Sequence, residues 1–150
     1  MQGAIHGLKY HAGFLHAHAL GTLMARELAR RRAPLPQLLI PVPLHRQRLF
    51  WRGYNQAAEL ARAMTRTLGV AVDSGAARRV RRTDDQIGRS AAERRRNVKG
   101  AFALERPLDG LHVALLDDVM TTGATLAELA RSCRHAGARR IEVWAAARVA

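Results

Sequence analysis

Two adjacent acids and a short hydroxyl-rich loop carry the clearest chemistry in the sequence. Asp117 and Asp118 follow the apolar run Val113 to Leu116, and a loop of threonines and one glycine lies just beyond them. Adjacent carboxylates repel each other unless hydrogen-bond donors or a cation compensate their charge, so a polyol or a divalent metal is expected there. Free backbone N–H groups at the start of a following helix, together with hydroxyl donors, suit a phosphate. The predicted binding residues are Asp117, Asp118, Thr121, Thr122, Gly123, Ala124 and Thr125.

The order of these groups predicts one ligand with two different ends. The acids would bind sugar hydroxyls or Mg²⁺, and the loop would bind a phosphate on the same molecule, as in a ribose 5-phosphate. A purely structural interpretation also fits, in which the acids are solvated residues at a strand end and Thr122 caps a helix. Two other phosphate-binding motifs are missing, because the sequence contains neither G-x-x-x-x-G-K-[ST] nor G-x-G-x-x-G.

A second group of candidates interleaves aromatic and basic residues. In the stretch RLFWRGYNQ, Phe50, Trp51 and Tyr54 lie close to Arg48 and Arg52. Aromatic rings beside arginines can stack on a nucleobase or on single-stranded DNA. The alternative, which we favour for Phe50 and Trp51, is that these rings pack beneath the loop and that Arg52 pairs with an acid.

The whole chain is basic, with 25 Lys+Arg against 12 Asp+Glu and a net charge of +13. Such an excess attracts nucleic acids and phosphorylated ligands, although an arginine-rich composition can also follow from genomic base composition. The run Arg94 to Arg96 fits a clamp on a phosphate or on the DNA backbone, and it equally fits a solvated helix face. Arg94 and Arg95 are retained as nucleic-acid candidates.

Composition excludes several classes of protein. With 150 residues, 48% of them hydrophobic, the chain is expected to form one domain over residues 1–150 with a genuine core. The single cysteine, Cys133, excludes an intramolecular disulfide and a cysteine metal cage within this chain, and its apolar helical neighbours predict a buried, inert thiol. No run of about 18 apolar residues and no signal peptide is evident, so we expect no membrane span and a cytoplasmic location.

Alternating strand and helix patterns position these residues. A helix is predicted over 14–32, where Leu15, Ala19, Leu23 and Leu28 have helical spacing. A second is predicted over 55–69, with Asn55 and Gly69 as its caps. Two more are predicted, a short one after the capping box of Ser90 and Glu93 and another over 125–137. Strands are predicted over 37–42, 70–72, 101–104, 111–116 and 140–149. This alternation indicates an α/β fold with a mostly parallel sheet, which binds ligands where its strands end. Residues 78–99 are rich in charge and are expected to include an exposed, mobile segment.

Several motifs, in order, resemble one known family. VALLDDVMTTGAT is similar to the phosphoribosyl pyrophosphate (PRPP) binding motif of type I phosphoribosyltransferases. The stretches LIPVPLHRQRLFWRGYNQAAELA, RTDDQIGRSAAERRRNVKGAF and GARRIEVWAAAR together resemble the ComF family of competence-associated, phosphoribosyltransferase-like proteins. With IHGLKYHAG near the start, the resemblance covers essentially the whole chain.

The resemblance implies a type I phosphoribosyltransferase-like fold, with helices on both sides of the sheet and a flexible loop around Thr83 to Asn97 that closes over PRPP. Asp117 and Asp118 would contact the ribose hydroxyls and Mg²⁺, and Thr121 to Thr125 would hold the 5-phosphate. Arg46 and Arg48 would face pyrophosphate, and a competence helicase is an implied partner. The family's N-terminal cysteine cluster, which resembles a zinc site, is missing from this sequence, either because the chain is truncated or because this member lacks it, so we expect no zinc here.

Two functions of different class follow as hypotheses. The first is a magnesium-dependent phosphoribosyltransferase in which an unidentified nitrogen nucleophile displaces pyrophosphate from PRPP, with Mg²⁺ and arginines stabilising the departing charge. The second is a non-catalytic module that binds single-stranded DNA during transformation and retains the phosphoribosyl pocket as a sensor or a relic. The two are compatible in one protein. Spacing identifies neither a catalytic base nor the acceptor base.

Overall fold

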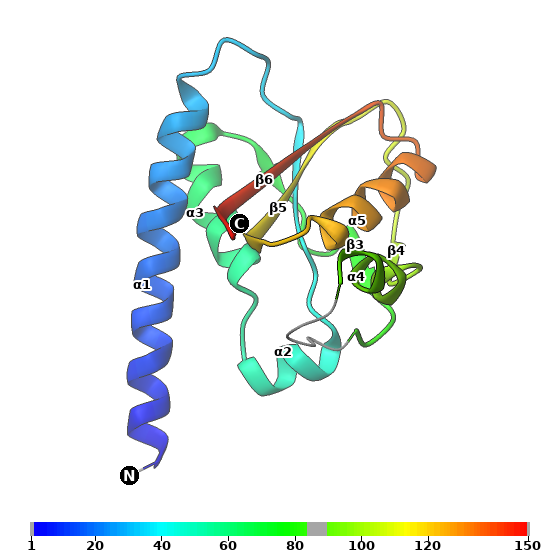
Figure 1. The fold of residues 1–150 in the computed structure, drawn as a ribbon. Coiled ribbons are helices and arrows are strands. Elements are labelled where there is room, and N and C mark those ends of the chain that lie inside the picture. Colours follow the sequence, from blue (N-terminus) through cyan, green and yellow to red (C-terminus); the bar gives the residue numbers. More distant parts are fainter. Residues whose placement is uncertain (1, 84–89, 150) are drawn as a thin grey trace.

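The computed structural model describes residues 2–83 and 90–149, and of residues 2–12, 14 and 91 only the backbone. At its centre lies a four-stranded sheet in which all neighbouring strands are parallel (Figure 1). The strand order is β2 (Ala71–Val72), β1 (Leu38–Pro41), β5 (His112–Met120) and β6 (Arg140–Arg148). The predicted α/β class with a parallel central sheet is therefore confirmed.

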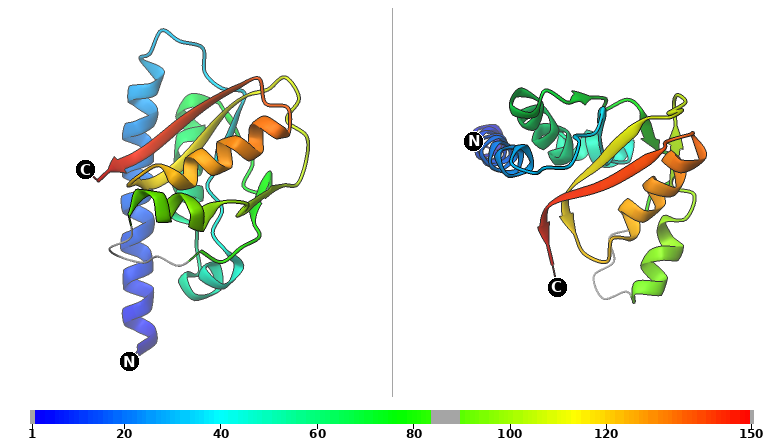
Figure 2. Two further views of the ribbon diagram at one scale, coloured as in Figure 1. Left: turned by 45° about the vertical axis from the view of Figure 1, so that its right-hand side comes forward. Right: turned by 90° about the horizontal axis from the view of Figure 1, so that it is seen from above.

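Helices cover both faces of this sheet, as the view from above in Figure 2 shows. The helices are α1 (Gln2–Ala29), α2 (Arg46–Arg52), α3 (Gln56–Leu68), α4 (Ala91–Val98) and α5 (Ala124–His135). Helices α1 and α3 share a core with Leu39 and Leu116, whereas α5 shares a core with Ile40 and Leu115. Neighbouring strand residues enter different cores because side chains alternate between the two faces of a strand.

The two central strands are apolar throughout because both of their faces are covered. All of Leu38–Pro41 is buried, and so is the run 113–116 of β5. A parallel sheet between two helical layers needs such continuous apolar runs. The strands predicted over 37–42 and 111–116 are thus confirmed, but β5 continues beyond 116 because its pairing with β6 extends as far as Met120 opposite Arg148.

Helix α1 packs on α3 through small residues. Its buried face is formed by Ala17, Gly21 and Ala25. A Cβ atom added to Gly21 would lie 2.8 Å from the backbone oxygen of Leu60, so the two helices are in close contact. Of the residues that the helical spacing predicted over 14–32 aligns, Leu28 packs against the core, whereas Leu15 and Leu23 are 71% and 58% exposed. Where α1 and α3 pack closely, their backbones leave no room for large side chains.

Local caps form as predicted. The Asn55 side chain accepts the N–H of Ala57 at 3.0 Å at the start of α3, and Gly69 ends that helix in a left-handed conformation with φ 67°. Ser90 Oγ accepts the N–H of Glu93 at 3.3 Å, while the Glu93 carboxylate accepts the N–H of Ser90 at 2.7 Å. The predicted capping box at the start of α4 is therefore confirmed.

Two elements were not predicted. Strand β3 (Ala77–Arg79) pairs antiparallel with β4 (Phe102–Leu104), and α2 occupies a stretch that was expected to be a loop. The segment 78–99, which was expected to include an exposed, mobile segment, begins in β3 and contains α4, the short helix predicted from the capping box. Residues 84–89, within the loop predicted to close over the ligand, lie outside the described residues.

Among the residues that the structure describes, no helix combines the length and the apolar character needed to cross a membrane.

Candidate functional site

The predicted site residues gather where the central parallel strands end, which we call the carboxyl end of the sheet. Strands β1 and β5 are parallel, so the segments that follow them leave the sheet on the same side. The segment after β1 leads into α2, and the segment after β5 leads into α5 (Figure 1). The fold thus brings the acid pair, the threonine loop and the basic helix α2 to one end of the sheet.

The two acids belong to strand β5 itself. Asp117 pairs with Ala145 of β6, and the strand continues to Met120, so the prediction that the acids follow the end of the strand was wrong. Leu115 enters the core beneath α5, and alternation along the strand places Asp117 on that same side and Asp118 on the side of α3. The two side chains therefore start on opposite faces of the strand, although their carboxyl groups still interact.

Burial gives Asp117 an unusual affinity for a proton. Burial, and after it the neighbouring Asp118 carboxyl group, raises the pKa of Asp117 from 3.8 to about 7, against smaller lowering effects of the Asp118 N–H and the Arg79 charge. The Asp118 N–H donates to Asp117 Oδ1 at 3.0 Å. A structural ion pair would lower the pKa of an acid. The raised pKa of Asp117 is instead typical of an acid at a functional site, where a ligand or a cation supplies the counter-charge.

The loop between β5 and α5 leaves helix amides without a side-chain cap. Gly123 is the N-cap of α5 with φ 73°, a left-handed conformation that favours glycine, and within the described part of the chain no side-chain hydrogen bond caps this helix from its N-cap. The Ala124 N–H reaches Thr122 Oγ1 at 3.4 Å, a long contact. Thr121 and Thr122 are exposed and Thr125 is half-buried. The amide and hydroxyl donors at this helix start are therefore placed to bind an anion.

Arg79 of β3 lies in the electrostatic environment of the acid pair and was missed from the sequence. Its side chain is buried, its guanidinium lies 5.5 Å from the centre of the Phe102 ring, and its Nη2 donates to Thr83 Oγ1. Its positive charge lowers the pKa of Asp117. In the sequence Arg79 is one of several arginines in a basic run, and only the pairing of β3 with β4 distinguishes it.

Helix α2 carries Arg46 and Arg48 together with two aromatic residues. Phe50 and Trp51 are 82% and 80% exposed, so the expectation that these rings pack beneath a loop was wrong. The reason is that all of α2 lies at the surface, with no buried residue. The roles predicted for Arg46 and Arg48 toward pyrophosphate stay predictions.

Arg52 and Tyr54, the other candidates of this stretch, contact neighbouring helices. Arg52 Nη1 donates to Gln56 Oε1 of α3 at 2.9 Å. Tyr54 is half-buried, and a Cβ atom added to Gly13 of α1 would lie 2.6 Å from its hydroxyl oxygen. Tyr54 therefore packs against α1, and a role for either residue toward a base stays a prediction.

Comparison with known proteins identifies relatives along most of the chain, although no protein-family model matches it. The chain is 42% identical over 144 residues to DNA utilization protein YhgH of Salmonella typhi, covering 93% of this chain and 63% of that protein. It is 43% identical over 117 residues to Competence protein F of Haemophilus influenzae, covering 76% of this chain and 51% of that protein. The predicted resemblance to the ComF family is confirmed by these two relatives. The chain spans less than two thirds of the length of these two relatives.

Solved structures establish the fold of this chain. Glutamine PRPP amidotransferase from B. subtilis superposes with a TM-score of 0.58 at 21% identity, covering 87% of this chain and 26% of that one. The hypoxanthine phosphoribosyl transferase of Trypanosoma cruzi superposes with a TM-score of 0.50 at 14% identity, covering 91% and 73%. At such identities the likeness concerns the fold alone, and the predicted phosphoribosyltransferase-like fold is confirmed.

A buried acid ties α4 to α5. Glu128 accepts the Gly100 N–H at 2.7 Å and Arg131 Nη2 at 2.6 Å, and the bond from Arg131 lowers the pKa of Glu128. Because Gly100 follows α4 directly, this contact fixes the end of α4 against α5. Helix α4 presents Arg94, half-buried, and Arg95, exposed, and their contact with nucleic acid stays a prediction.

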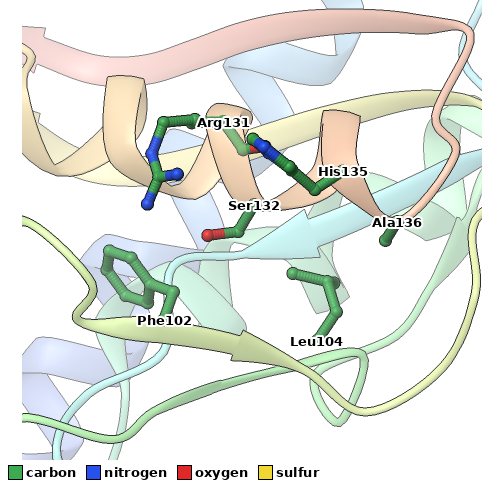
Figure 3. Close-up of a pocket in the computed structure, with 6 residues that line it drawn as sticks. All are labelled: Phe102, Leu104, Arg131, Ser132, His135 and Ala136. Atoms are coloured by element: carbon green, nitrogen blue, oxygen red, sulfur yellow. The ribbon is translucent and has the colours of Figure 1, made fainter.

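A pocket of about 360 Å³ lies between β4 and the C-terminal half of α5, away from the start of that helix (Figure 3). It is lined by Phe102, Leu104, Arg131, Ser132, His135 and Ala136. Its polar groups already bond within α5: Arg131 to Glu128, Ser132 Oγ to the Glu128 backbone oxygen at 3.2 Å, and His135 Nδ1 to the Arg131 backbone oxygen at 2.7 Å. None of the predicted site residues lines it.

The cysteine of α5 is structural, as predicted. Cys133 is completely buried in the core beneath α5. Burial raises the pKa of its thiol to about 11. A thiol with so high a pKa carries very little thiolate near neutral pH and is therefore a poor nucleophile.

Proposed function

We propose that the carboxyl end of the sheet binds a 5-phosphoribosyl ligand, PRPP or a related ribose 5-phosphate, together with Mg²⁺. The observation that carries the proposal is Asp117, an acid whose pKa burial and a neighbouring carboxyl group raise to about 7, on the strand that leads into an uncapped helix start. An acid pair short of positive charge and a group of free amide donors suit the two ends of one sugar phosphate.

Each group of residues would bind a different part of this ligand. Asp117 and Asp118 would accept hydrogen bonds from the ribose hydroxyls. The segment Thr121 to Thr125 would donate backbone and hydroxyl hydrogen bonds to the 5-phosphate. Arg46 and Arg48, at the end of the strand next to β5, would neutralise the charge of pyrophosphate.

The residues present fit Mg²⁺. This ion takes oxygen ligands and is usually held by one or two carboxylates together with substrate phosphates, which matches Asp117 and Asp118 beside a phosphorylated sugar. When bound, Mg²⁺ supplies positive charge that offsets the charge of the acids and of the ligand's phosphates. Asp117 would then be held ionised, because a nearby cation favours the charged form of an acid.

The chemistry that such a site would serve is transfer of the phosphoribosyl group. The bond between ribose C1 and the pyrophosphate oxygen would break, and a bond between C1 and a nitrogen nucleophile would form. The chain's own contribution would be to orient the sugar through the acids and to stabilise the departing charge through the arginines of α2. One of the solved structures that share this fold is a PRPP amidotransferase, which supports the assignment of the ligand class.

Calorimetric titration with PRPP and Mg²⁺ tests this proposal. The Asp117→Asn, Asp118→Asn double variant should lose binding, whereas the Glu105→Gln, Asp109→Asn variant, which removes two acids outside the site, should bind as the unaltered protein does. Equal affinity in the two variants would reject the sugar-binding role of the acids. A screen of nucleobases for pyrophosphate release then separates the two versions of the function, since release indicates a transferase and binding without release indicates a sensor.

A second candidate function is the handling of single-stranded DNA in natural competence. The net charge of +13 favours it, and so do the names of the relatives, a DNA utilization protein and a Competence protein F. The affinity for an oligonucleotide should then fall steeply with salt, because phosphate contacts release counterions. Salt-independent or undetectable binding would reject this candidate. A competence helicase as a partner is part of the same proposal.

A further inference from the structure

Helix α2 presents two large aromatic rings to solvent. Phe50 and Trp51 are 82% and 80% exposed and form an edge-to-face pair, with ring centroids 6.0 Å apart and an angle of 84° between the rings. Neither residue is among the strong helix formers, and at this exposure neither ring contributes much apolar burial to the fold. Neighbouring Leu49 is 43% exposed as well and adds to the exposed apolar surface of α2. A contiguous exposed apolar surface on a soluble domain marks a site of interaction.

The backbone beneath these rings is anchored at both ends. The His45 side chain accepts the N–H of Gln47 at 3.4 Å, and the Gly53 N–H donates to the Leu49 backbone oxygen at 2.7 Å. Arg82 donates to Gln47 Oε1 at 3.3 Å, which connects the helix to the segment after β3. The rings therefore stand on a helix that is capped at both ends and lies at the carboxyl end of the sheet.

The charge around the rings selects the class of partner. Helix α2 is seven residues long, contains Arg46, Arg48 and Arg52, and has no acidic residue. Three guanidinium groups around two exposed rings disfavour an apolar protein partner, because charged residues are depleted from the cores of protein interfaces. The helix is also too short for the long apolar face with which amphipathic helices lie in a membrane surface. A polyanion that carries flat rings complements both features.

We propose that α2 is a base-stacking platform for single-stranded nucleic acid, in which Phe50 and Trp51 stack on bases and Arg46, Arg48 and Arg52 contact phosphates. The proposal rests on the second candidate function and identifies the surface that performs it. Stacking on aromatic side chains tolerates any base, so the platform binds without strong sequence preference. Its position after β1 puts the bound strand beside the proposed phosphoribosyl site.

An abasic oligonucleotide isolates the contribution of the rings. Fluorescence anisotropy would compare a labelled oligothymidylate with an abasic strand of the same length and charge. The protein should bind the oligothymidylate more tightly, by about tenfold or more for each stacked base. Equal affinity for the two strands, or no binding of either at low salt, would overturn the platform.

Two sets of variants assign the preference to α2. Phe50→Leu with Trp51→Leu should reduce the affinity for oligothymidylate to that for the abasic strand, while Leu15→Ala with Leu23→Ala, which trims exposed apolar side chains of α1, should keep the preference. Arg46→Gln, Arg48→Gln, Arg52→Gln should flatten the dependence of log affinity on log salt by about 2, because each phosphate that an arginine neutralises contributes about 0.7 to that slope. The control set is Arg26→Gln, Arg66→Gln, Arg139→Gln, which removes equal charge elsewhere and should flatten it less. A preference that survives the leucine substitutions would overturn the proposal.

Two further measurements separate this proposal from its alternatives. The Phe50→Leu, Trp51→Leu protein should bind PRPP and Mg²⁺ as the unaltered protein does, and an unchanged circular dichroism spectrum would verify its fold. Failure of the unaltered protein to bind PRPP would reject the proposed ligand site and leave the oligonucleotide result intact. Binding to vesicles of anionic lipid that these substitutions abolish, with oligonucleotide binding unchanged, would overturn the platform in favour of a membrane contact.

Discussion

The central sheet holds a partly buried acid near each end of its parallel strands, and the two acids have different surroundings. At the amino end, Glu142 lies 2.5 Å from Arg31 Nη1, 2.9 Å from His112 Nε2 and 3.1 Å from Trp144 Nε1. Burial alone would raise the pKa of Glu142, but these hydrogen bonds outweigh burial and lower it. At the carboxyl end, burial and a second carboxyl group raise the pKa of Asp117 to about 7.

This difference fits a structural role for Glu142 and the ligand-binding role that we propose for Asp117. The donors around Glu142 come from the segment after α1 and from two strands, so the acid joins three parts of the molecule. Asp117 faces another acid, and a counter-charge for the pair would come with a ligand. Two acids of one sheet therefore have pKa values shifted in opposite directions, because only Glu142 is surrounded by donors that outweigh its burial.

The largest expected effect comes from removing the acid at the amino end. Glu142→Gln should lower the free energy of unfolding by about 2–4 kcal/mol, because it leaves the partly buried guanidinium of Arg31 without its counter-charge. Urea denaturation at neutral pH measures the change. Glu27→Gln is the matched control, since its pair with Arg30 is largely exposed and should contribute less than about 1 kcal/mol. Similar losses in the two variants would contradict a special structural role of Glu142.

Ligand binding should be the next largest effect and should act at the carboxyl end only. Ribose 5-phosphate with Mg²⁺, at about 100 times the dissociation constant, should stabilise the folded state by about 2.7 kcal/mol and raise the melting temperature by about 5 °C or more. Glu142→Gln should retain this increase from its lower starting temperature, and Asp117→Asn with Asp118→Asn should lose it. Potassium chloride at matched ionic strength is the control, and an equal increase with it would argue against a specific site.

A smaller effect is expected from neutralising Asp117 in the absence of ligand. Because the pKa of Asp117 is raised in the folded state, the protonated carboxyl group contributes to the stability of the fold. This contribution is fully present below about pH 4 and is lost as the pH rises through about 7. Asp117→Asn should therefore be more stable than the unaltered protein at pH 8, and its advantage should exceed that at pH 5 by about 1–2 kcal/mol. Denaturation at the two pH values measures it.

The control for this pH dependence is Asp73→Asn. The Asp73 carboxylate accepts Arg106 Nε at 2.8 Å, so its removal should not stabilise the protein at either pH. A constant difference between Asp117→Asn and the unaltered protein across this range would show that Asp117 titrates as an ordinary acid, and the contrast with Glu142 would disappear.

The smallest effect concerns Arg79, the one positive charge identified as acting on Asp117 among the described residues. Arg79→Met keeps an apolar side chain against Phe102 but removes the charge, so the pKa of Asp117 should rise by less than about one unit. Carbon NMR of the carboxyl group follows this titration directly. Arg79→Lys retains the charge and should leave the pKa closer to that of the unaltered protein. No shift in Arg79→Met would remove Arg79 from the site.

Much of the local structure was predictable because its causes are local. Asn55, Gly69 and the Ser90–Glu93 box each act within a few residues, and all three form as expected. The run 113–116 was recognisable as a strand because a short, uninterrupted apolar run is typical of a parallel strand that is covered on both faces. Placing the acids and the threonine loop at the carboxyl end of a parallel sheet followed from that assignment.

The errors concern which side of an element faces its neighbours. Leu15 and Leu23 have the spacing of a buried stripe, but the close approach of α3 selects the small residues of α1 instead. Phe50 and Trp51 are exposed although apolar rings are usually buried, because all of α2 lies at the surface of the molecule. Neither outcome can be read from a period or from a residue type, since both depend on a partner that is distant in sequence.

The amino-acid sequence by itself determined the order of the elements, the caps of the helices and the place of the acid pair at the end of the buried run, because backbone propensity, capping and binary patterning act over a few neighbouring residues. Only the tertiary structure decided that burial and the charge of Arg79 act on Asp117, that Glu142 gathers donors from three segments, and that α2 exposes its rings. Burial and electrostatic fields are sums over atoms brought together from distant parts of the chain, and no local pattern contains those sums.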